Sequence, residues 1–382
     1  MKIFRTNTPR DITLHDGEYP ANLEPTDVVE IFETPLTGSY NWDYTVQDNR
    51  IKKLYELGKQ LNWNVEVDVD WSPEYKGMDP EEFEFENTQW DKHPVFNKMD
   101  KETKLEFLTD LNSWALSQFL HGEQGALLVA SQLVSCAPTF NAKMYAASQT
   151  FDEARHVEVF NRYLQEKIGF HYPINPNLKA LLDKILTDER WDLKFIGMQI
   201  IIEGLALAAF TNMKLSARDP LLKTLLHYVI RDEARHVTFG INYLEDFVKT
   251  LSPEEVEDRA QFAYEACVIS RDRLINTKAM QKYLKMSDEE VREFQLGNGA
   301  MDQFRSFLFS RVMPNLKKIG LLTDSVRPKY EELGILEYEH APSDFEIDWA
   351  EITKPLESSD QVKAESDAML AEIVKAQEAA NS

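Results

Sequence analysis

The sequence Asp-Glu-Ala-Arg-His occurs twice in this chain, first from Asp152 to His156 and again from Asp232 to His236. In each copy a glutamate precedes a histidine by three positions, as Glu153 and His156 and as Glu233 and His236. Residues three apart lie on one face of an α-helix, so each pair can direct a carboxylate and an imidazole toward one point. The doubled motif therefore predicts two long helices that face a shared polar site.

The same repeat extends to two further glutamates. Glu123 and Glu203 are separated by the same interval as the two motifs, and each precedes its own Glu-x-x-His pair by an equal stretch of chain. Ala and Leu follow both glutamates at the same offsets, and Tyr-Leu follows both histidines. This spacing indicates two helical hairpins related by a pseudo-twofold axis, each of which supplies half of one site.

Hydrophobic periodicity and Pro/Gly breakers predict an all-α chain. We expect the bundle helices at 101–136, 139–168, 188–215 and 219–251, and further helices at 50–63, 252–277, 287–295 and 300–320. Residues 64–100 are expected to form a loop, residues 323–358 an acidic extended segment, and the final stretch, 359–382, either a solvated tail or a helix docked on a partner subunit. Three parts follow: an N-terminal arm with a short helix (1–100), a helical domain (101–322), and an acidic C-terminal extension with a terminal helix (323–382).

Composition excludes several classes of function. The formal net charge is −23, which argues against nucleic acid and anionic membrane surfaces as partners. The N-terminus has no apolar signal core, so we expect a cytoplasmic protein without a membrane segment. Two cysteines cannot hold an iron–sulfur cluster, and no dinucleotide-binding glycine motif is present. Electrons for any redox chemistry must therefore come from an external donor, a reductase or a ferredoxin.

Glu123 and Glu203 both lie on apolar helix faces, where a charged and unpaired carboxylate would cost several kcal/mol to bury. Either glutamate alone could simply be paired or neutral, and either Asp-Glu-Ala-Arg-His alone could be a helix-face salt-bridge cluster. Together, the donors recur in the order Glu, Glu-x-x-His, which favours a dinuclear metal site. Four carboxylates with two imidazoles suit Fe or Mn rather than structural zinc. Glu123 and Glu203 are the candidate catalytic carboxylates.

Residues next to the donors have predicted supporting roles. Asp152 and Asp232 can accept the second N–H of a ligating imidazole, either on their own helix or across the bundle. Arg155 and Arg235 can pair with these aspartates, or they can be solvated on the surface. Apolar side chains one or two turns from the donors either line a substrate pocket or are ordinary core: Phe119, Ala126, Phe160, Leu207 and Phe210.

Over residues 101–250 the chain resembles the ferritin-like diiron carboxylate superfamily. The segment 54–71 is similar to the hydroxylase subunits of bacterial multicomponent monooxygenases. The resemblance implies a ferritin-like four-helix bundle with additional helices and extended N- and C-terminal segments, two Fe ions (or Mn/Fe), O2 as co-substrate, and a homodimer. It also implies the iron ligands, which are Glu123, Glu153, His156, Glu203, Glu233 and His236, with Asp152 and Asp232 bound to the histidines.

The branch within this superfamily is open, because the chain departs from each. The hydroxylases carry Thr where this chain has Leu207, and the p-aminobenzoate N-oxygenases add a His where it has Val229. Ribonucleotide reductase small subunits usually have Asp at the position of Glu123 and often a radical Tyr at that of Phe160.

The leading hypothesis is an O2-activating oxygenase that hydroxylates or N-oxygenates a small, largely apolar organic substrate. A ferroxidase or other iron-handling protein is the first alternative. The second is a Mn/Fe or diiron oxidase that generates a radical, with four candidate residues: Tyr145, Tyr163, Tyr228 and Tyr243.

Overall fold

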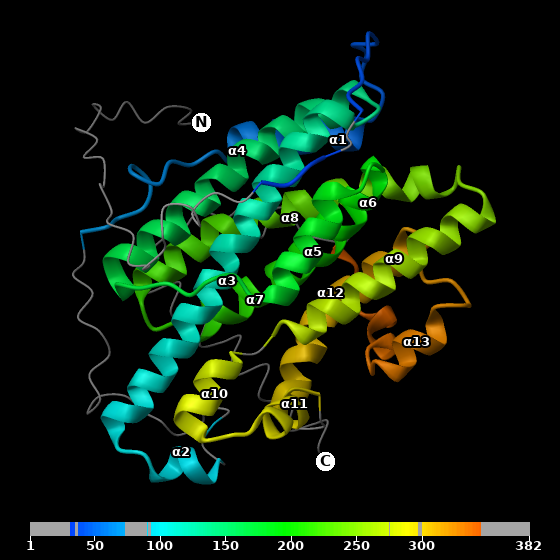
Figure 1. Ribbon diagram of the computed structural model, residues 1–382. Coiled ribbons are helices and arrows are strands. Elements are labelled where there is room, and N and C mark those ends of the chain that lie inside the picture. Colours follow the sequence, from blue (N-terminus) through cyan, green and yellow to red (C-terminus); the bar gives the residue numbers. More distant parts are fainter. Residues whose placement is uncertain are drawn as a thin grey trace.

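The computed structural model describes residues 31–34, 37–72, 90, 93–274, 276–296 and 300–344, and within them it contains helices and no strands. Four long helical segments form the bundle (Figure 1). They are α3 (Lys101–Cys136), α4 (Phe140–Tyr163), the continuous segment α6 (Trp191–Phe195), η3 (Ile196–Ile202) and α7 (Glu203–Ser216), and α8 (Pro220–Val248). The all-α, ferritin-like prediction is confirmed.

The ends of the first hairpin follow from local chemistry. The Asp100 side chain accepts a hydrogen bond from the backbone N–H of Thr103 and so caps α3. Thr139 caps α4 in the same way, shortly after α3 ends. The α4 helix continues into a π-helical turn, η2 (Leu164–Ile168), which ends at Gly169 with φ of +86°, a conformation that suits glycine.

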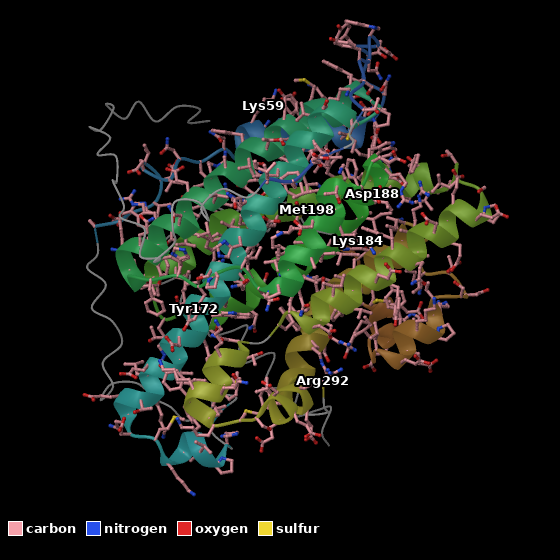
Figure 2. All side chains as sticks on the ribbon, viewed as in Figure 1. Lys59, Tyr172, Lys184, Asp188, Met198 and Arg292 are labelled. Atoms are coloured by element: carbon pink, nitrogen blue, oxygen red, sulfur yellow. The ribbon has the colours of Figure 1, made fainter. Side chains whose placement is uncertain are left out.

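The second hairpin is less regular than the first. Its first helical segment changes from α-helical geometry in α6 to π-helical geometry over η3, and the α-helix resumes at Glu203. Met198 of η3 lies fully buried inside the bundle (Figure 2). The whole segment Trp191–Ser216 is long and apolar enough to cross a membrane, but most of it is buried within the protein. Its apolar composition therefore reflects its place in the core.

Further helices cover the bundle (Figure 1). Against it pack α1 (Asn49–Gln60) on α4 and α8, α5 (Pro176–Thr187) on α3, α9 (Pro253–Asp272) on α5 and η3, and α12 (Ala300–Lys318) on α7. A separate apolar cluster, which includes Trp90, Phe96 and Phe107, fixes three short helices near the N-terminal end of α3. These are α2 (Pro94–Lys98), α10 (Thr277–Leu284) and α11 (Asp288–Leu296).

Several predicted boundaries were wrong. No helix was predicted between residues 168 and 188, yet α5 lies there; Asn175 caps the helix and Pro176 is its first residue. Short helices also interrupt the expected loop at α2 and the expected extended segment at α13 (Arg327–Glu332) and η4 (Leu336–His340). The predicted C-terminal helix lies outside the described residues, and the division into three parts stays a prediction.

Candidate metal centre

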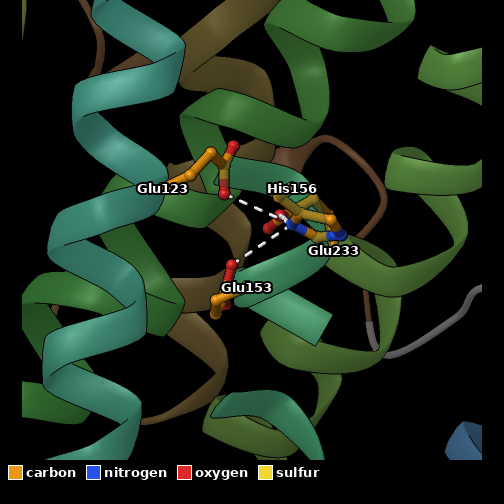
Figure 3. A group of neighbouring side chains, drawn as sticks. All are labelled: Glu123, Glu153, His156 and Glu233. Carbon is orange, nitrogen blue, oxygen red and sulfur yellow. Dashed lines mark hydrogen bonds and ion pairs between the residues drawn. The ribbon is translucent and has the colours of Figure 1, made fainter. Parts of the chain in front are cut away.

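The six repeated donors meet in the middle of the bundle. They are at most 5% exposed, and they come from α3 (Glu123), α4 (Glu153, His156), α7 (Glu203) and α8 (Glu233, His236). Their atoms form two overlapping groups, in each of which all donor atoms lie within 4.8 Å of one another. The first comprises Glu123, Glu153, His156 and Glu233 (Figure 3), and the second Glu153, Glu203 and His236. Glu153 belongs to both groups.

The two imidazoles point the same ring nitrogen into the cluster. His156 Nδ1 lies 3.1 Å from Glu233 Oε1, 3.2 Å from Glu153 Oε2 and 3.3 Å from Glu123 Oε2. His236 Nδ1 lies 3.1 Å from Glu153 Oε1 and 3.7 Å from Glu233 Oε2. Each Nδ1 is thus surrounded by carboxylate oxygens, as expected for atoms that share a cation.

The other ring nitrogens form a reciprocal pair of contacts across the bundle. His156 Nε2 lies 3.3 Å from Asp232 Oδ2, and His236 Nε2 lies 3.2 Å from Asp152 Oδ2. Of the two arrangements considered from the sequence, the aspartates therefore adopt the one across the bundle. An Nε2–H that donates to a carboxylate leaves Nδ1 with its lone pair directed into the cluster.

Two buried guanidinium groups join the aspartates. Arg155 Nη2 lies 2.5 Å from Asp152 and 3.0 Å from Asp232, and Arg235 Nη2 lies 2.9 Å and 2.7 Å from the same two carboxylates. The Arg235 side chain is fully buried. These two aspartates and two arginines form a ring of alternating charges, the aspartate–arginine square, which holds α4 against α8 next to the donors. Because both guanidinium groups are buried, neither arginine is solvated on the surface.

The buried cluster strongly perturbs its own ionisation. Burial, followed by repulsion from Glu233, raises the pKa of Glu123 well above its usual value, and burial does the same to the pKa of Glu203. Burial opposes ionisation of Glu153 too, but attraction to His236 and His156 prevails and lowers its pKa. Burial likewise opposes the charged imidazoles, yet the surrounding carboxylates raise the pKa of both histidines. Without a cation, protons must therefore neutralise this site.

Several donor atoms also lack a hydrogen-bond partner among the described residues. These atoms are Glu153 Oε2, Glu203 Oε2, both carboxylate oxygens of Glu233, and His236 Nδ1. Buried polar atoms without partners are costly, and metal coordination satisfies them. Four carboxylates balance two divalent ions, and oxygen-rich ligands with one imidazole per ion suit Fe or Mn. The donor set thus fits the predicted cofactor, Fe/Fe or Mn/Fe.

Two side chains that hydrogen-bond to the donors or to their aspartate partners were not predicted from the sequence. Gln149 Nε2 donates to Glu153 Oε1 at 3.0 Å and to Glu203 Oε1 at 2.8 Å. Its position one turn before Glu153, on the same helix face, was the available signal. Trp63 Nε1 donates to Asp232 Oδ2 at 2.7 Å from the segment that follows α1. No local pattern in the sequence predicts that contact, because the two residues are 169 positions apart.

A cavity of about 120 Å³ opens beside the cluster. Glu123, Glu203 and Glu233 line it, together with Phe119 and Ala126 of the predicted pocket. The other three residues of that prediction are absent from its described lining. Phe160 and Phe210 are fully buried and stack on each other behind Phe119, with ring centroids 5.5 Å apart, and Leu207 belongs to the main core. Their part in substrate binding stays a prediction.

Residues 45–320 match the model of the family described as p-aminobenzoate N-oxygenase AurF. The chain belongs to this family. Membership confirms the resemblance to ferritin-like diiron proteins and makes the chain an oxidoreductase of the diiron class. The match is to the family described as p-aminobenzoate N-oxygenases, although Val229 stands where that family was expected to carry histidine.

Among solved structures, the chain is similar to R2-like ligand-binding oxidases. A variant with an anaerobically reconstituted Mn/Fe cofactor is 20% identical, with a TM-score of 0.49, over 72% of this chain and 95% of that one. An aerobically reconstituted Mn/Fe form is also 20% identical, with a TM-score of 0.48, over 72% of this chain and 94% of that one. A likeness at this level transfers no function. The comparison with curated proteins gives no match.

Proposed function

We propose that this chain is an O2-dependent oxygenase that acts on a small organic substrate in the cavity beside the donor cluster. One observation carries the proposal. The three glutamates Glu123, Glu203 and Glu233 face the cavity, whereas the histidines are backed by the buried aspartate–arginine square. Such a site is open to substrate on one side and rigidly supported on the other. The family's name favours N-oxygenation over hydroxylation.

Each part of the chain has a distinct proposed role. The six donors would hold two Fe ions, or one Mn and one Fe, and the bound pair would supply the electrons that reduce O2. Asp152 and Asp232 fix the direction of the imidazoles, and Arg155 and Arg235 hold those aspartates in place. The walls at Phe119 and Ala126 position the substrate and exclude water. An external reductase or ferredoxin restores the electrons, and a cytoplasmic homodimer is the proposed setting.

Metal content is the first test. Protein produced with iron should hold about two Fe per chain by elemental analysis, and Glu123→Ala should lower that number and abolish turnover. Glu158→Ala is the matched control, because Glu158 lies on α4 near Glu153 but is exposed. Retention of two Fe and full activity in Glu123→Ala would remove the assignment.

Oxygen incorporation is the second test. Iron-loaded protein, a chemical reductant and p-aminobenzoate or aniline under ¹⁸O2 should give a labelled organic product by mass spectrometry. Oxidation of many Fe(II) ions per chain with no labelled product would instead support an iron-handling protein.

A radical-generating oxidase is the second candidate, and Tyr145 is the observation that favours it. Its side chain is fully buried and its hydroxyl has no hydrogen-bond partner in the described part of the chain. Burial raises the pKa of this phenol, against the attraction of His236 and Arg235. A tyrosyl signal in electron paramagnetic resonance after O2 exposure, absent in Tyr145→Phe, would support this candidate.

A further inference from the structure

We propose that the groove between α1 and α4 is the docking site of the electron donor, and that this donor is an acidic one-electron carrier protein of the ferredoxin type. The inference rests on the proposed function in one respect, that electrons reach the metal centre from an external protein. It assigns the surface at which that protein binds and the sign of the charge that it carries.

A groove of about 400 Å³ lies between these two helices. One wall comes from α1 and the residues just after it, and the other comes from α4. The lining side chains that matter here are Tyr55, Lys59 and Asn62 on the first wall, and Phe151 and Asp152 on the second. On each wall they lie on one face of the chain, because they are three, four or one position apart along helical turns.

The floor of the groove is in contact with the metal centre. Asp152 lines the groove although it is only 2% exposed, and its Oδ2 lies 3.2 Å from Nε2 of His236. The other nitrogen of that imidazole points into the donor cluster. A single carboxylate therefore separates a protein bound in the groove from a histidine of the donor set. Because electron transfer slows steeply with distance, this short separation makes the groove a suitable entry point for electrons.

The groove is also separate from the cavity proposed for the substrate. The two share no lining residue among those described. Glu123, Glu203 and Glu233 line the substrate cavity, whereas the groove reaches the centre from behind His236, at the aspartate–arginine square. A protein bound in the groove would therefore leave the substrate cavity open.

Phe151 gives the groove an exposed apolar anchor. This residue is 58% exposed and directly precedes Asp152 in the chain. The centroid of its ring lies 4.9 Å from the guanidinium carbon of Arg155, which in turn bonds Asp152. Lys59, labelled in Figure 2, and Asn62 add an exposed polar rim. An aromatic side chain surrounded by polar residues is typical of the centre of a protein–protein interface.

Two lysines flank the groove on its α1 wall. The Nζ atoms of Lys52 and Lys59 lie 5.3 Å and 4.7 Å from the centroid of the Tyr55 ring, which lines the groove. Both lysines pair with the same carboxylate, that of Glu56. One negative charge therefore faces two positive charges, and the rim of the groove keeps a positive excess.

The charge of α1 is opposite in sign to that of the chain as a whole. The helix contains four basic residues, of which Arg50 pairs with acidic residues outside the helix, and one acidic residue. The whole chain has a formal net charge of −23. Most of the surface would therefore repel an acidic protein, whereas α1 attracts it, so charge directs such a partner to this groove.

The electron transfer balances one electron at a time. A reduced carrier loses one electron, and one Fe(III) ion of the bound pair gains it and becomes Fe(II). A second carrier then reduces the second ion. The first carrier must leave before the second can bind, which suits the small, charge-guided contacts of electron-transfer complexes.

Binding is measured first, by calorimetry on the metal-free protein with an acidic plant-type [2Fe–2S] ferredoxin at low ionic strength. Wild-type protein should bind the ferredoxin, and added salt should weaken the complex because it screens exposed charges. Lys59→Glu and Phe151→Ala should each weaken binding by at least about fivefold. Lys98→Glu is the matched control, because it makes the same change of charge at an exposed position of α2, at the opposite end of the molecule from α1 (Figure 1).

Electron transfer is measured second, by stopped-flow absorbance on the iron-loaded Fe(III) protein. Photochemically reduced ferredoxin, kept below saturation, should reduce Phe151→Ala at least about fivefold more slowly than wild type. Dithionite is a small reductant that needs no docking surface, so it should reduce both proteins at the same rate. Equal slowing with both reductants would show that Phe151 affects the metal centre rather than docking, and would contradict the proposal.

Two binding results would overturn the proposal. One is a wild-type protein that binds no ferredoxin at low ionic strength. The other is equal weakening in Lys59→Glu and Lys98→Glu, which would show that only the overall charge matters. If Lys59→Glu failed to fold by circular dichroism, Phe151→Ala, which changes an exposed side chain, would still decide.

The binding measurement needs neither metal nor substrate, so it separates this inference from the proposed function. Ferredoxin binding that depends on Lys59 and Phe151, in a protein that incorporates no ¹⁸O, would contradict the proposed function alone. Labelled product formed with dithionite, by a protein that binds no ferredoxin, would contradict this inference alone.

Discussion

The two hairpins of the bundle supply identical donors, yet the residues one turn before those donors differ. In the first hairpin, Phe119 precedes Glu123, and at the equivalent position of the second hairpin Gln199 precedes Glu203. The residues one turn after the donor histidines also differ. Phe160 follows His156 on α4, whereas Gly240 follows His236 on α8. Phe119 and Phe160 pack as aromatic rings, with centroids 6.1 Å apart, whereas a Cβ on Gly240 would lie 2.6 Å from the Cβ of Gln199.

This difference shows how a symmetric donor set can become an asymmetric site. Phe119 gives the first hairpin an apolar wall next to the cavity. Gln199 of the second hairpin donates through Nε2 to Oε1 of Gln149, at 3.4 Å. Gln149 lies on α4 of the first hairpin and donates to both Glu153 and Glu203. One side of the cluster is therefore shaped for an organic molecule, and the other side holds carboxylates in fixed positions through neutral hydrogen-bond donors.

The largest effect is expected at Glu153, the donor shared by both groups. Glu153→Ala should lose both metal ions, because each group would lose a carboxylate, whereas Glu203→Ala should mainly affect the group that contains His236. Elemental analysis of both variants beside the wild-type protein measures this. Similar losses in the two variants would show that the two halves do not hold separate ions.

A smaller effect is expected at Gln149. Gln149→Leu should weaken metal binding by about 10- to 100-fold, the usual cost of losing a partner of a metal ligand. The weakening should be greater for the ion bound by Glu203, since that glutamate has no other described hydrogen bond. Val229→Leu is the control, because Val229 occupies the same position before Glu233 and is apolar. Titration with Fe(II) under anaerobic conditions gives both affinities, and equal affinities in wild type and Gln149→Leu would refute a supporting role.

The close approach of α8 to η3 predicts a change in stability. Gly240→Ala should lower the free energy of unfolding by about 1–3 kcal/mol, because the added methyl group overlaps the Gln199 Cβ. Gly204→Ala should be neutral or stabilising by up to about 1 kcal/mol, since its nearest neighbour is Val312 Cγ2 at 3.5 Å. Urea denaturation of both variants measures the difference. Equal stabilities would mean that the second hairpin has room for a side chain at Gly240.

The smallest effect concerns pH in the metal-free protein. Glu123, Glu203, His156 and His236 all have raised pKa values when folded, so the stability they contribute is present below their unfolded pKa values and is lost as pH rises. The free energy of unfolding should therefore fall between about pH 5 and pH 8. Metal-loaded protein should show the opposite trend, because metal binding releases protons. Denaturant unfolding of both forms at several pH values tests this sign.

Local patterns predicted most of the bundle and its donors. The α3 helix has the bounds that were expected, because Asp100 and Pro138 mark its ends in the sequence itself. The donors could be found because the Glu-x-x-His spacing and its exact repetition along the chain are properties of the sequence alone. Helix α5 was missed because a proline after asparagine suits both a turn and the first turn of a helix.

Features that depend on distant contacts could not be predicted. The bond from Trp63 to Asp232, and the arrival of Arg273 at the cavity from α9, depend on how separate elements pack. The π-helical turn η3 was also missed, since hydrophobic periodicity cannot distinguish a helix with one extra residue from a regular one in a stretch that is apolar on all sides.

Because of that extra residue, the direction in which the donor Glu203 points depends on the number of residues in η3. Each residue turns an α-helix by about 100°, so removing one position within η3 would rotate Glu203 by roughly that angle relative to α6 while the composition of the core stayed almost the same. A protein so shortened could still fold around its apolar interior while one carboxylate faced the wrong way. Insertions and deletions in this segment are therefore a route by which related chains could lose or change their reaction without losing their bundle.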